Sequence, residues 1–92
     1  MITAIVLVRT TREAVSETAE RLAAMKHVSE CYSVTGEWDI VVVLRFGQFE
    51  DLDEIVTQGL RQVPGIERTS TMLAFKALSK DLLDKGFGIG GE

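Results

Sequence analysis

The sequence is poor in the residues on which many small-protein sites depend. Among 92 residues it has one cysteine, Cys31, one histidine, His27, and one proline. A single cysteine excludes an intrachain disulfide and a cysteine-based zinc site. A single histidine gives no support to a Ser/His/Asp or Cys/His catalytic set. We therefore interpret Cys31 and His27 as structural and expect no catalytic residues, no bound metal and no cofactor.

The chain also lacks a long apolar run, a basic leader and an excess of positive charge. No run reaches the roughly 20 apolar residues of a membrane span, and no leader precedes a cleavage site. We expect no membrane partner, and one cysteine fits a reducing, cytoplasmic compartment. Ten basic against fourteen acidic residues give a net charge of −4. This balance argues against direct DNA binding, because nucleic-acid surfaces are usually basic.

What remains is the composition of one globular domain. The chain is 46% hydrophobic and 26% charged, and it is too short to hold two separate cores. A chain of this size buries only roughly 60–65% of the surface that it exposes when unfolded. We therefore expect an oligomer.

Hydrophobic spacing and turn residues predict six regular elements. In chain order they are a strand at 2–9, a helix at 12–26, strands at 28–35 and 38–46, a helix at 49–62 and a strand at 66–76. Thr10 and Glu13 have the spacing of a capping box for the first helix. Residues 1–78 are thus predicted to form one domain, and residues 79–92 a short helical turn and a Gly-rich tail.

The order β-α-β-β-α-β predicts an α+β ferredoxin-like sandwich. Right-handed crossovers and a central hairpin give a four-stranded antiparallel sheet of order 4-1-3-2, with both helices on one face. The other face of such a sheet is polar in a typical monomer. Here the inner strands are apolar on both sides, through Ile5 and Leu7 in one and Val41 and Val43 in the other. A second copy packed face to face would cover this surface by two-fold symmetry.

The segment from Gly36 to Asp39 is the most informative part of the sequence. Glycine and an acidic residue suit a hairpin turn. Trp38 is either a lid on the core or a platform for a ligand or partner. Asp39 either accepts hydrogen bonds from turn amides or binds a ligand ammonium. Both interpretations stay open on the residues alone.

The last strand carries a run of hydroxyl side chains after Arg68, namely Thr69, Ser70 and Thr71. The β-propensity of an edge strand explains the run. The run also suits the polar lining of a site for a small zwitterion, with hydroxyls and amides near the carboxylate and Asp39 near the amine. The sequence leaves these alternatives open.

Two stretches resemble the effector domain of the Lrp/AsnC regulators, also called the RAM domain. Residues 34–43 resemble the family's hairpin, in which Thr-Gly, an aromatic residue and Asp precede an apolar strand. Residues 60–71 resemble its helix end, Pro-Gly turn and Thr-x-Thr stretch. The resemblance covers about residues 2–76. The two motifs at this spacing are fairly specific, whereas either alone is weak.

The resemblance implies domains that dimerise through their sheets and assemble further, to octamers. A small effector, typically an amino acid, would bind between dimers near the hairpin. Transferred by position, the loop that holds its amino and carboxylate ends comprises Thr35, Gly36, Glu37, Trp38 and Asp39. The last strand of a neighbouring subunit would contribute Thr69, Ser70 and Thr71.

The chain departs from full-length family members in one respect. They carry an N-terminal helix-turn-helix module, whereas the first strand begins here at residue 2. The resemblance therefore implies a stand-alone effector domain that does not bind DNA itself. Such a domain would modulate transcription by co-assembly with a full-length relative.

Two other functions stay open. Small enzymes of the dimeric α+β barrel type, such as cofactor-free monooxygenases, share this topology and sheet pairing. An enzyme of that kind would need a closed pocket within one subunit, lined by His27 or Tyr32. A ligand-free structural adaptor would instead have its hairpin loop filled by protein side chains.

Overall fold

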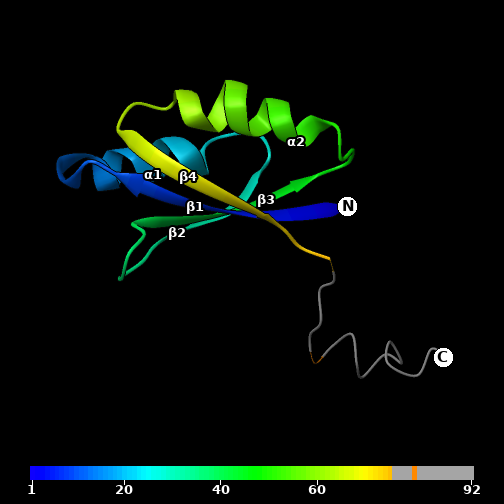
Figure 1. Ribbon diagram of the computed structural model, residues 1–92, viewed down its shortest axis with the longest axis horizontal. Helices are drawn as coiled ribbons and strands as arrows, with labels where there is room; N and C mark the ends of the chain where they lie inside the picture. The colour runs from blue at the N-terminus through cyan, green and yellow to red at the C-terminus, as the bar shows by residue number, and fades with distance from the viewer. Residues whose placement is uncertain (76–79, 81–92) are drawn as a thin grey trace.

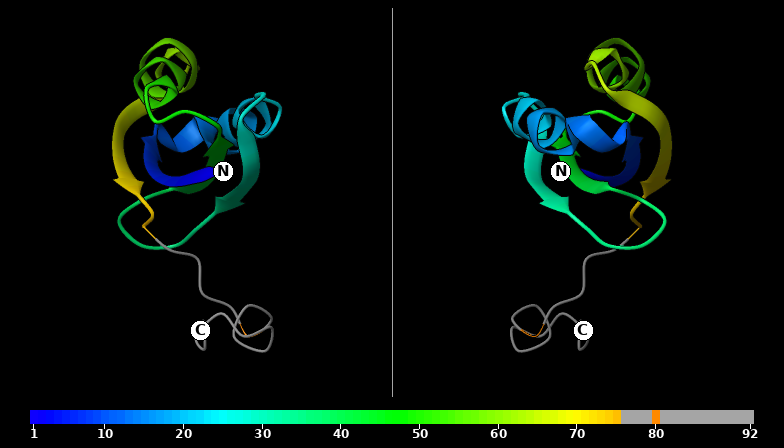
Figure 2. Two further views of the ribbon diagram at one scale, coloured as in Figure 1. Left: turned by 90° about the vertical axis from the view of Figure 1, so that its right-hand side faces the viewer. Right: turned by 90° about the vertical axis from the view of Figure 1, so that its left-hand side faces the viewer.

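The computed structural model describes residues 1–75 and residue 80. Figure 1 shows one antiparallel sheet with the helices packed on a single face. The strands are β1 (Ile2–Thr10), β2 (Val28–Ser33), β3 (Ile40–Phe46) and β4 (Ile66–Leu73). They lie in the order β2-β3-β1-β4, and the side views place both helical segments over the same face (Figure 2). The predicted ferredoxin-like fold is therefore confirmed.

The first helical segment begins at Arg12 as predicted but ends three residues early, whereas the second begins two residues late and ends at Gln62 as predicted. The first has a 3₁₀ turn at Arg12–Ala14 and then α1 (Val15–Ala23). The second begins as α2 (Asp51–Glu54), and a π turn at Ile55–Gly59 and a 3₁₀ turn at Leu60–Gln62 continue it. Val63 is extended because the ring of the following proline disfavours a helical conformation there.

Two further points complete the comparison with the predicted elements. Within the described residues, no helix has the length and apolar content needed to cross a bilayer. The helical turn predicted at 79–85 and the tail at 86–92 lie, apart from Lys80, outside the described residues.

The predicted capping box is wrong. Thr10 is the last residue of β1, and its hydroxyl donates a hydrogen bond to the carbonyl oxygen of Thr11 at 2.9 Å. Thr11 takes the N-cap position without a side-chain cap. The strand continues through Thr10 because the Asp39 carboxylate accepts a hydrogen bond from its amide at 2.9 Å. A long-range bond therefore replaces the local one that the sequence spacing suggested.

The hydrophobic core lies between the sheet and the helices. Alternate residues of β1 and β3 point into it, and both Val6 and Val42 are fully buried. Leu22 of α1 and Leu60 of the second helical segment cover them and are also fully buried. Burying a leucine side chain of this kind stabilises the fold by about 1.5–3 kcal/mol. The core thus fixes which face of each inner strand meets the helices.

The turn before β4 is held tightly against α1. The buried Thr18 hydroxyl donates to the Pro64 carbonyl oxygen at 3.1 Å, and the Thr11 amide donates to the Gly65 carbonyl oxygen at 2.9 Å. Gly65 has a φ of +96°, a backbone conformation that residues other than glycine rarely adopt. This turn therefore connects the second helical segment, the start of β4 and α1.

The sheet face away from the helices is apolar along its two inner strands, as the sequence predicts, whereas the outer strands add Glu30 beside Val43 and Ser70 beside Leu7. Ile5 and Leu7 of β1 and Val41 and Val43 of β3 lie on it and are only partly buried. On the outer strands, the face extends through exposed neighbours of these residues, namely Tyr32 beside Val41 and Met72 beside Ile5. We call this surface the open sheet face. The helices of the same chain leave it uncovered (Figure 2).

Candidate functional site at the β2–β3 hairpin

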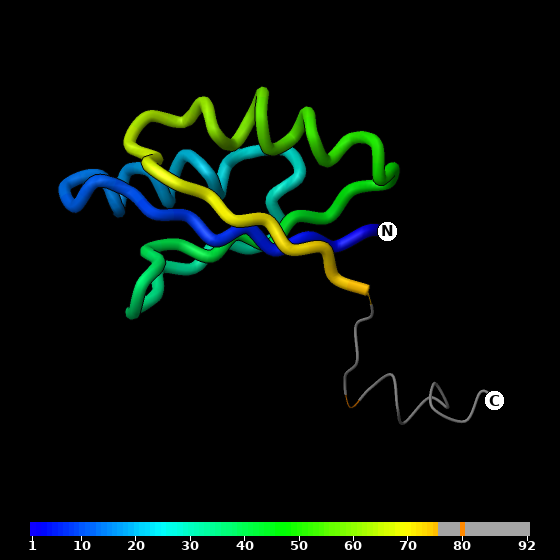
Figure 3. Tube along the Cα trace, in the orientation of Figure 1, coloured from blue at the N-terminus to red at the C-terminus, as the bar shows by residue number. Residues whose placement is uncertain are grey.

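The segment between β2 and β3 projects beyond the sheet, away from the helices (Figures 1 and 3). Gly36 in this loop has a φ of +106°, and a Cβ atom there would meet no atom within 4 Å. Glycine is therefore required by backbone conformation alone. Its neighbours Thr35 and Glu37 are exposed, whereas Trp38 and Asp39 are partly buried at the base of the loop.

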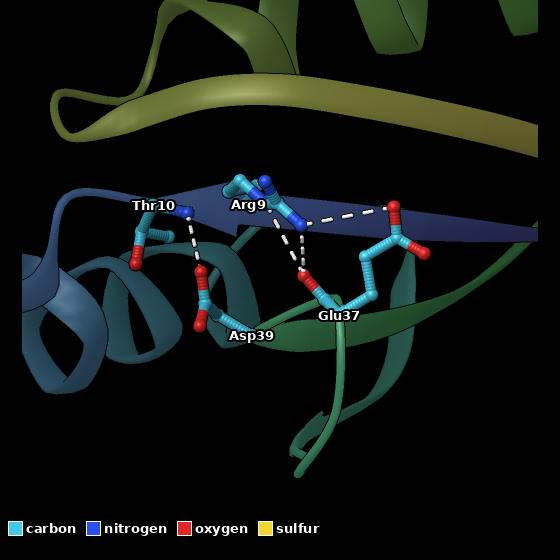
Figure 4. Close-up of polar contacts among 4 residues, drawn as sticks. All are labelled: Arg9, Thr10, Glu37 and Asp39. Carbon is cyan, nitrogen blue, oxygen red and sulfur yellow. Dashed lines mark hydrogen bonds and ion pairs between the residues drawn. The ribbon is translucent and has the colours of Figure 1, made fainter.

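Asp39 joins the hairpin to β1. Its Oδ2 accepts the hydrogen bond from the Thr10 amide at 2.9 Å (Figure 4). Its own amide donates to the Val8 carbonyl oxygen at 2.9 Å. The pairing of β1 with β3 ends at Val8 and Ile40, so the Thr10 amide, which points toward β3 as the Val8 carbonyl group does, is available to this carboxylate. One oxygen of Asp39 thus has a structural role, on a β1 amide rather than on a turn amide.

Arg9 closes the side of the hairpin loop. Its Nε donates to the Glu37 carbonyl oxygen at 3.1 Å, and its Nη2 donates to the same oxygen. The Glu37 carboxylate lies 3.8 Å from Nη2, in the arrangement drawn in Figure 4. The pair is solvated, so the ion pair itself contributes little to stability. The two hydrogen bonds to the Glu37 carbonyl oxygen orient the guanidinium group toward the loop.

Two arginines flank Trp38. The guanidinium carbon of Arg9 lies 5.8 Å from the centre of the indole ring, and that of Arg68 lies 5.4 Å from it. Arg9 and Arg68 are direct partners across β1 and β4, so both project from the open sheet face beside the hairpin. The sequence analysis missed Arg9, because only the register of the sheet places it opposite Arg68.

The hydroxyl run of β4 is divided by the alternation of the strand. Ser70 lies opposite Leu7 on the open sheet face, whereas Thr69 and Thr71 lie opposite the buried Val8 and Val6. Successive side chains of a strand point to opposite faces. The three residues therefore do not form one lining within this chain, and only Ser70 shares the face of Arg68.

Two surface cavities lie on the helical side of the molecule. One, of about 400 Å³, includes Thr71 together with Phe49, Leu52 and Val56. The other, of about 440 Å³, includes His27 and lies between the loop before β2 and the second helical segment. Tyr32 does not line it and is 51% exposed on β2. Of the two residues named for an enzyme, His27 therefore lines a surface cavity and Tyr32 does not. The described residues contain no cluster of three metal-ligating side chains.

Two titratable groups of β2 have shifted pKa values. Burial raises the pKa of the Cys31 thiol, whose Sγ lies 3.7 Å from the Ala19 carbonyl oxygen. The pKa of Tyr32 is raised because its phenol donates a hydrogen bond to Glu30 and because that negative charge disfavours the phenolate. A thiol with a raised pKa is a poor nucleophile near neutral pH, which agrees with a structural Cys31.

The substitution Glu30→Gln should lower the pKa of Tyr32 toward its ordinary value of 10.0. Glutamine removes the negative charge and leaves only an amide oxygen, a weaker hydrogen-bond acceptor than a carboxylate, so the two largest causes of the shift are weakened or lost while desolvation remains. Tyr32 is the only tyrosine, so phenolate absorbance as a function of pH reports it alone. Because the folded pKa lies above the unfolded one, stability is lost as the pH rises through it, and this loss should be smaller in Glu30→Gln. An unchanged phenol titration in Glu30→Gln, with Glu67→Gln as control, would exclude Glu30 as the cause.

A ferredoxin-like sandwich with an uncovered apolar face and one polar, aromatic hairpin defines a class of protein. It is a small α+β domain whose own helices cover one face of its sheet and leave the other uncovered. The Lrp/AsnC ligand binding domain matches residues 3–83, and the chain belongs to this family. The resemblance noted in the two motifs is therefore confirmed.

The curated relatives are longer regulators. Two HTH-type transcriptional regulators of Pyrococcus furiosus are each 35% identical to this chain, over 72% and 87% of its length. The chain spans about half the length of these relatives, 44% and 53%.

Solved structures agree with the fold. TTHA0845 of Thermus thermophilus is 45% identical, with a TM-score of 0.81 over 87% of this chain and 100% of that chain. AsnC of E. coli has a TM-score of 0.79 at 14% identity, over 85% of this chain and 53% of its own. A feast or famine regulatory protein of M. tuberculosis, complexed with L-methionine, has a TM-score of 0.73 at 23% identity. The match covers 88% of this chain and 54% of that protein's chain. The last two are likenesses of fold.

Proposed function

We propose that this chain is an amino-acid-sensing, oligomeric domain that modulates transcription and is not an enzyme. The observation that carries the proposal is the match of residues 3–83 to a ligand-binding domain whose longer relatives are named as transcriptional regulators. Co-assembly with such a full-length regulator and a cytoplasmic location belong to the proposal. Direct DNA binding does not belong to it, because the net charge of −4 is unfavourable for binding to a polyanion.

The proposed effector site is the loop formed by Thr35, Gly36, Glu37, Trp38 and Asp39. Asp39 has a second carboxylate oxygen beyond the one that accepts from Thr10, and an ammonium group is a suitable donor for it. L-Methionine is bound in the related structures from M. tuberculosis and Neisseria meningitidis. Free amino acids are therefore the ligands to test.

Residues of a second subunit complete the proposed site. Thr69, Ser70 and Thr71 are proposed to contribute from β4 of a neighbour, between dimers of an assembly such as an octamer. Thr69 and Thr71 lie opposite buried residues of their own β1, on the side of the sheet away from the hairpin arginines. Any contribution of these two residues to a hairpin site thus requires a second chain.

The dimer itself is proposed to form through the open sheet face. Ile5, Leu7, Val41 and Val43 are partly exposed on adjacent strands. Transfer of such apolar surface out of water yields about 25 cal/mol per Å². A few hundred Å² of contact on each copy therefore stabilises a dimer by several kcal/mol.

A ligand-free adaptor is the second candidate function. The Arg9 side chain favours this function because its contact with the Glu37 carbonyl oxygen fills part of the hairpin loop.

A calorimetric screen of the twenty amino acids tests the ligand. We expect saturable binding to the oligomer, and we expect Asp39→Asn to weaken it at least tenfold by removing the charge that holds the ammonium. The asparagine side chain still offers an oxygen to the Thr10 amide, so the fold is retained. Asp51→Asn, at an exposed aspartate of α2, is the matched control.

The outcomes separate the functions. An oligomer that binds none of the twenty amino acids would leave the adaptor as the better account. Affinity unchanged in Asp39→Asn would exclude this carboxylate as the ammonium anchor.

A further inference from the structure

We infer that Arg68, held on the Trp38 ring beside Arg9, is the carboxylate-binding group of this hairpin. The hydroxyl run of β4 would then not be the main anchor for that end of a ligand. The anion site follows from the geometry of Arg9, Trp38 and Arg68. Its assignment to the carboxylate of an amino-acid effector rests on the proposed function.

The two guanidiniums are placed at a cost in free energy. Arg9 and Arg68 are direct cross-strand partners, and like charges opposite each other destabilise a sheet. Trp38 offsets part of this cost, because both guanidinium carbons lie within 6 Å of its ring centre and cations are attracted to the face of an indole. The ring thus holds two positive charges near one point of the surface.

The positive charge of Arg9 and Arg68 together is only half neutralised by carboxylates of the described residues. In the part of the chain that the structure describes, the ion pairs are Arg9 with Glu37 and Arg21 with Glu17. Arg68 therefore has no carboxylate within 4 Å among these residues, and it is exposed. Two arginines and one glutamate leave a net charge of +1 around the ring. Asp39 carries the opposite charge at the base of the same loop, so the hairpin as a whole matches a zwitterion whose carboxylate lies at the arginines.

The chemistry of arginine favours a carboxylate. The guanidinium is a planar fork of N–H donors that binds two oxygens of a carboxylate side by side. Stacking on Trp38 restricts the rotation of the Arg68 side chain, so less conformational entropy is lost when an anion binds. Ser70 follows two residues later on the same face, but it lies opposite Leu7, in the part of the open sheet face that the proposed dimer covers. Thr69 and Thr71 of the same chain lie on the opposite face, so Arg68 is the group of this β4 that is available to the carboxylate.

A titration with simple anions tests the site without the effector. Trp38 is the only tryptophan, so its fluorescence reports events at the ring. We expect sodium acetate, replacing chloride at constant ionic strength, to change the emission of the full chain saturably in the millimolar range. Arg68→Gln should weaken this response at least tenfold, and Arg68→Lys, which keeps the charge but not the fork, should weaken it less.

Arg45→Gln is the matched control. Arg45 is an exposed arginine of β3 that contacts Thr3 and Ser29 rather than Trp38, so its loss should leave the acetate response unchanged. No saturable response in the wild type, or an equal response in Arg68→Gln, would overturn the inference. Inorganic phosphate binding at least tenfold more tightly than acetate would overturn the assignment to a carboxylate.

A second experiment links the site to the effector. For an amino acid that binds in the screen, its amide lacks the carboxylate and should bind at least tenfold more weakly to the wild type. Arg68→Gln should bind acid and amide about equally. Equal binding of both by the wild type would overturn the carboxylate site while amino-acid sensing stands. A response to acetate without binding of any amino acid would overturn the effector assignment and the proposed function together, while the anion site stands.

Discussion

Replacing Gly65 by alanine is expected to lower the free energy of unfolding by about 2–4 kcal/mol. The φ of +96° at this position costs a residue with a Cβ atom roughly 1–2 kcal/mol. That Cβ would also lie 2.7 Å from the Thr18 hydroxyl oxygen and 2.8 Å from the Ala14 Cβ, and overpacking of this kind costs about 1–3 kcal/mol. Thermal unfolding should show a drop in Tm of about 10 °C or more.

Two glycines separate the contributions to this effect. Gly36 has a φ of +106° but open space around it, so Gly36→Ala should cost about 1 kcal/mol from backbone strain alone. Gly47 has open space and no positive φ, so Gly47→Ala should change stability by less than about 0.5 kcal/mol or raise it slightly. If Gly65→Ala lowers the free energy of unfolding no more than Gly36→Ala does, then the turn at Gly65 does not pack as closely against α1 as described.

The substitution Leu7→Glu is expected to convert a dimer into a monomer. Leu7 lies in the middle of the open sheet face, on an inner strand. Against a second sheet, the glutamate would be a buried charge without a partner, which costs several kcal/mol. The dimer dissociation constant should therefore rise at least a hundredfold, since 1.4 kcal/mol corresponds to a factor of ten. Sedimentation equilibrium at micromolar concentration measures this directly.

A matched variant controls for the added charge. Gln58→Glu adds one negative charge at an exposed position of the second helical segment and should leave the dimer intact. Circular dichroism should show that Leu7→Glu keeps its sheet. A wild-type chain that is monomeric at micromolar concentration would contradict the pairing of sheets. A dimer that persists in Leu7→Glu would show that another surface pairs.

Much of the fold could be predicted because its signals are local. The segment Ile40–Phe46 is a run of branched and apolar residues between turn signals, and such a run forms a buried strand in most contexts. The same residues indicate an apolar open face, since Val41 and Val43 alternate with Val42. The capping box failed because a carboxylate 29 residues away, that of Asp39, binds the Thr10 amide. No local rule includes that bond.

The surroundings of the candidate hairpin could be predicted only in part, and its role as a binding site stays a prediction. The segment from Gly36 to Asp39 was singled out because a tryptophan and an aspartate are unusual at a hairpin base, and it does lie beside β1 and the arginines. Arg9 was missed because its role depends on the partner that the sheet gives it. The three hydroxyls of β4 were treated as one group, although strand alternation places Ser70 on one face and its two neighbours on the other.

The sequence by itself determined the order of helices and strands, the residues of the core and the apolar character of both sheet faces. These properties depend on the period of the side chains along the chain, which each segment carries within itself. Only the tertiary structure decided that Arg9, Trp38 and Arg68 meet. Their meeting depends on the register between β1 and β4 and on the hydrogen bond from Thr10 to Asp39. Register is a relation between distant segments, and packing of the whole core selects it.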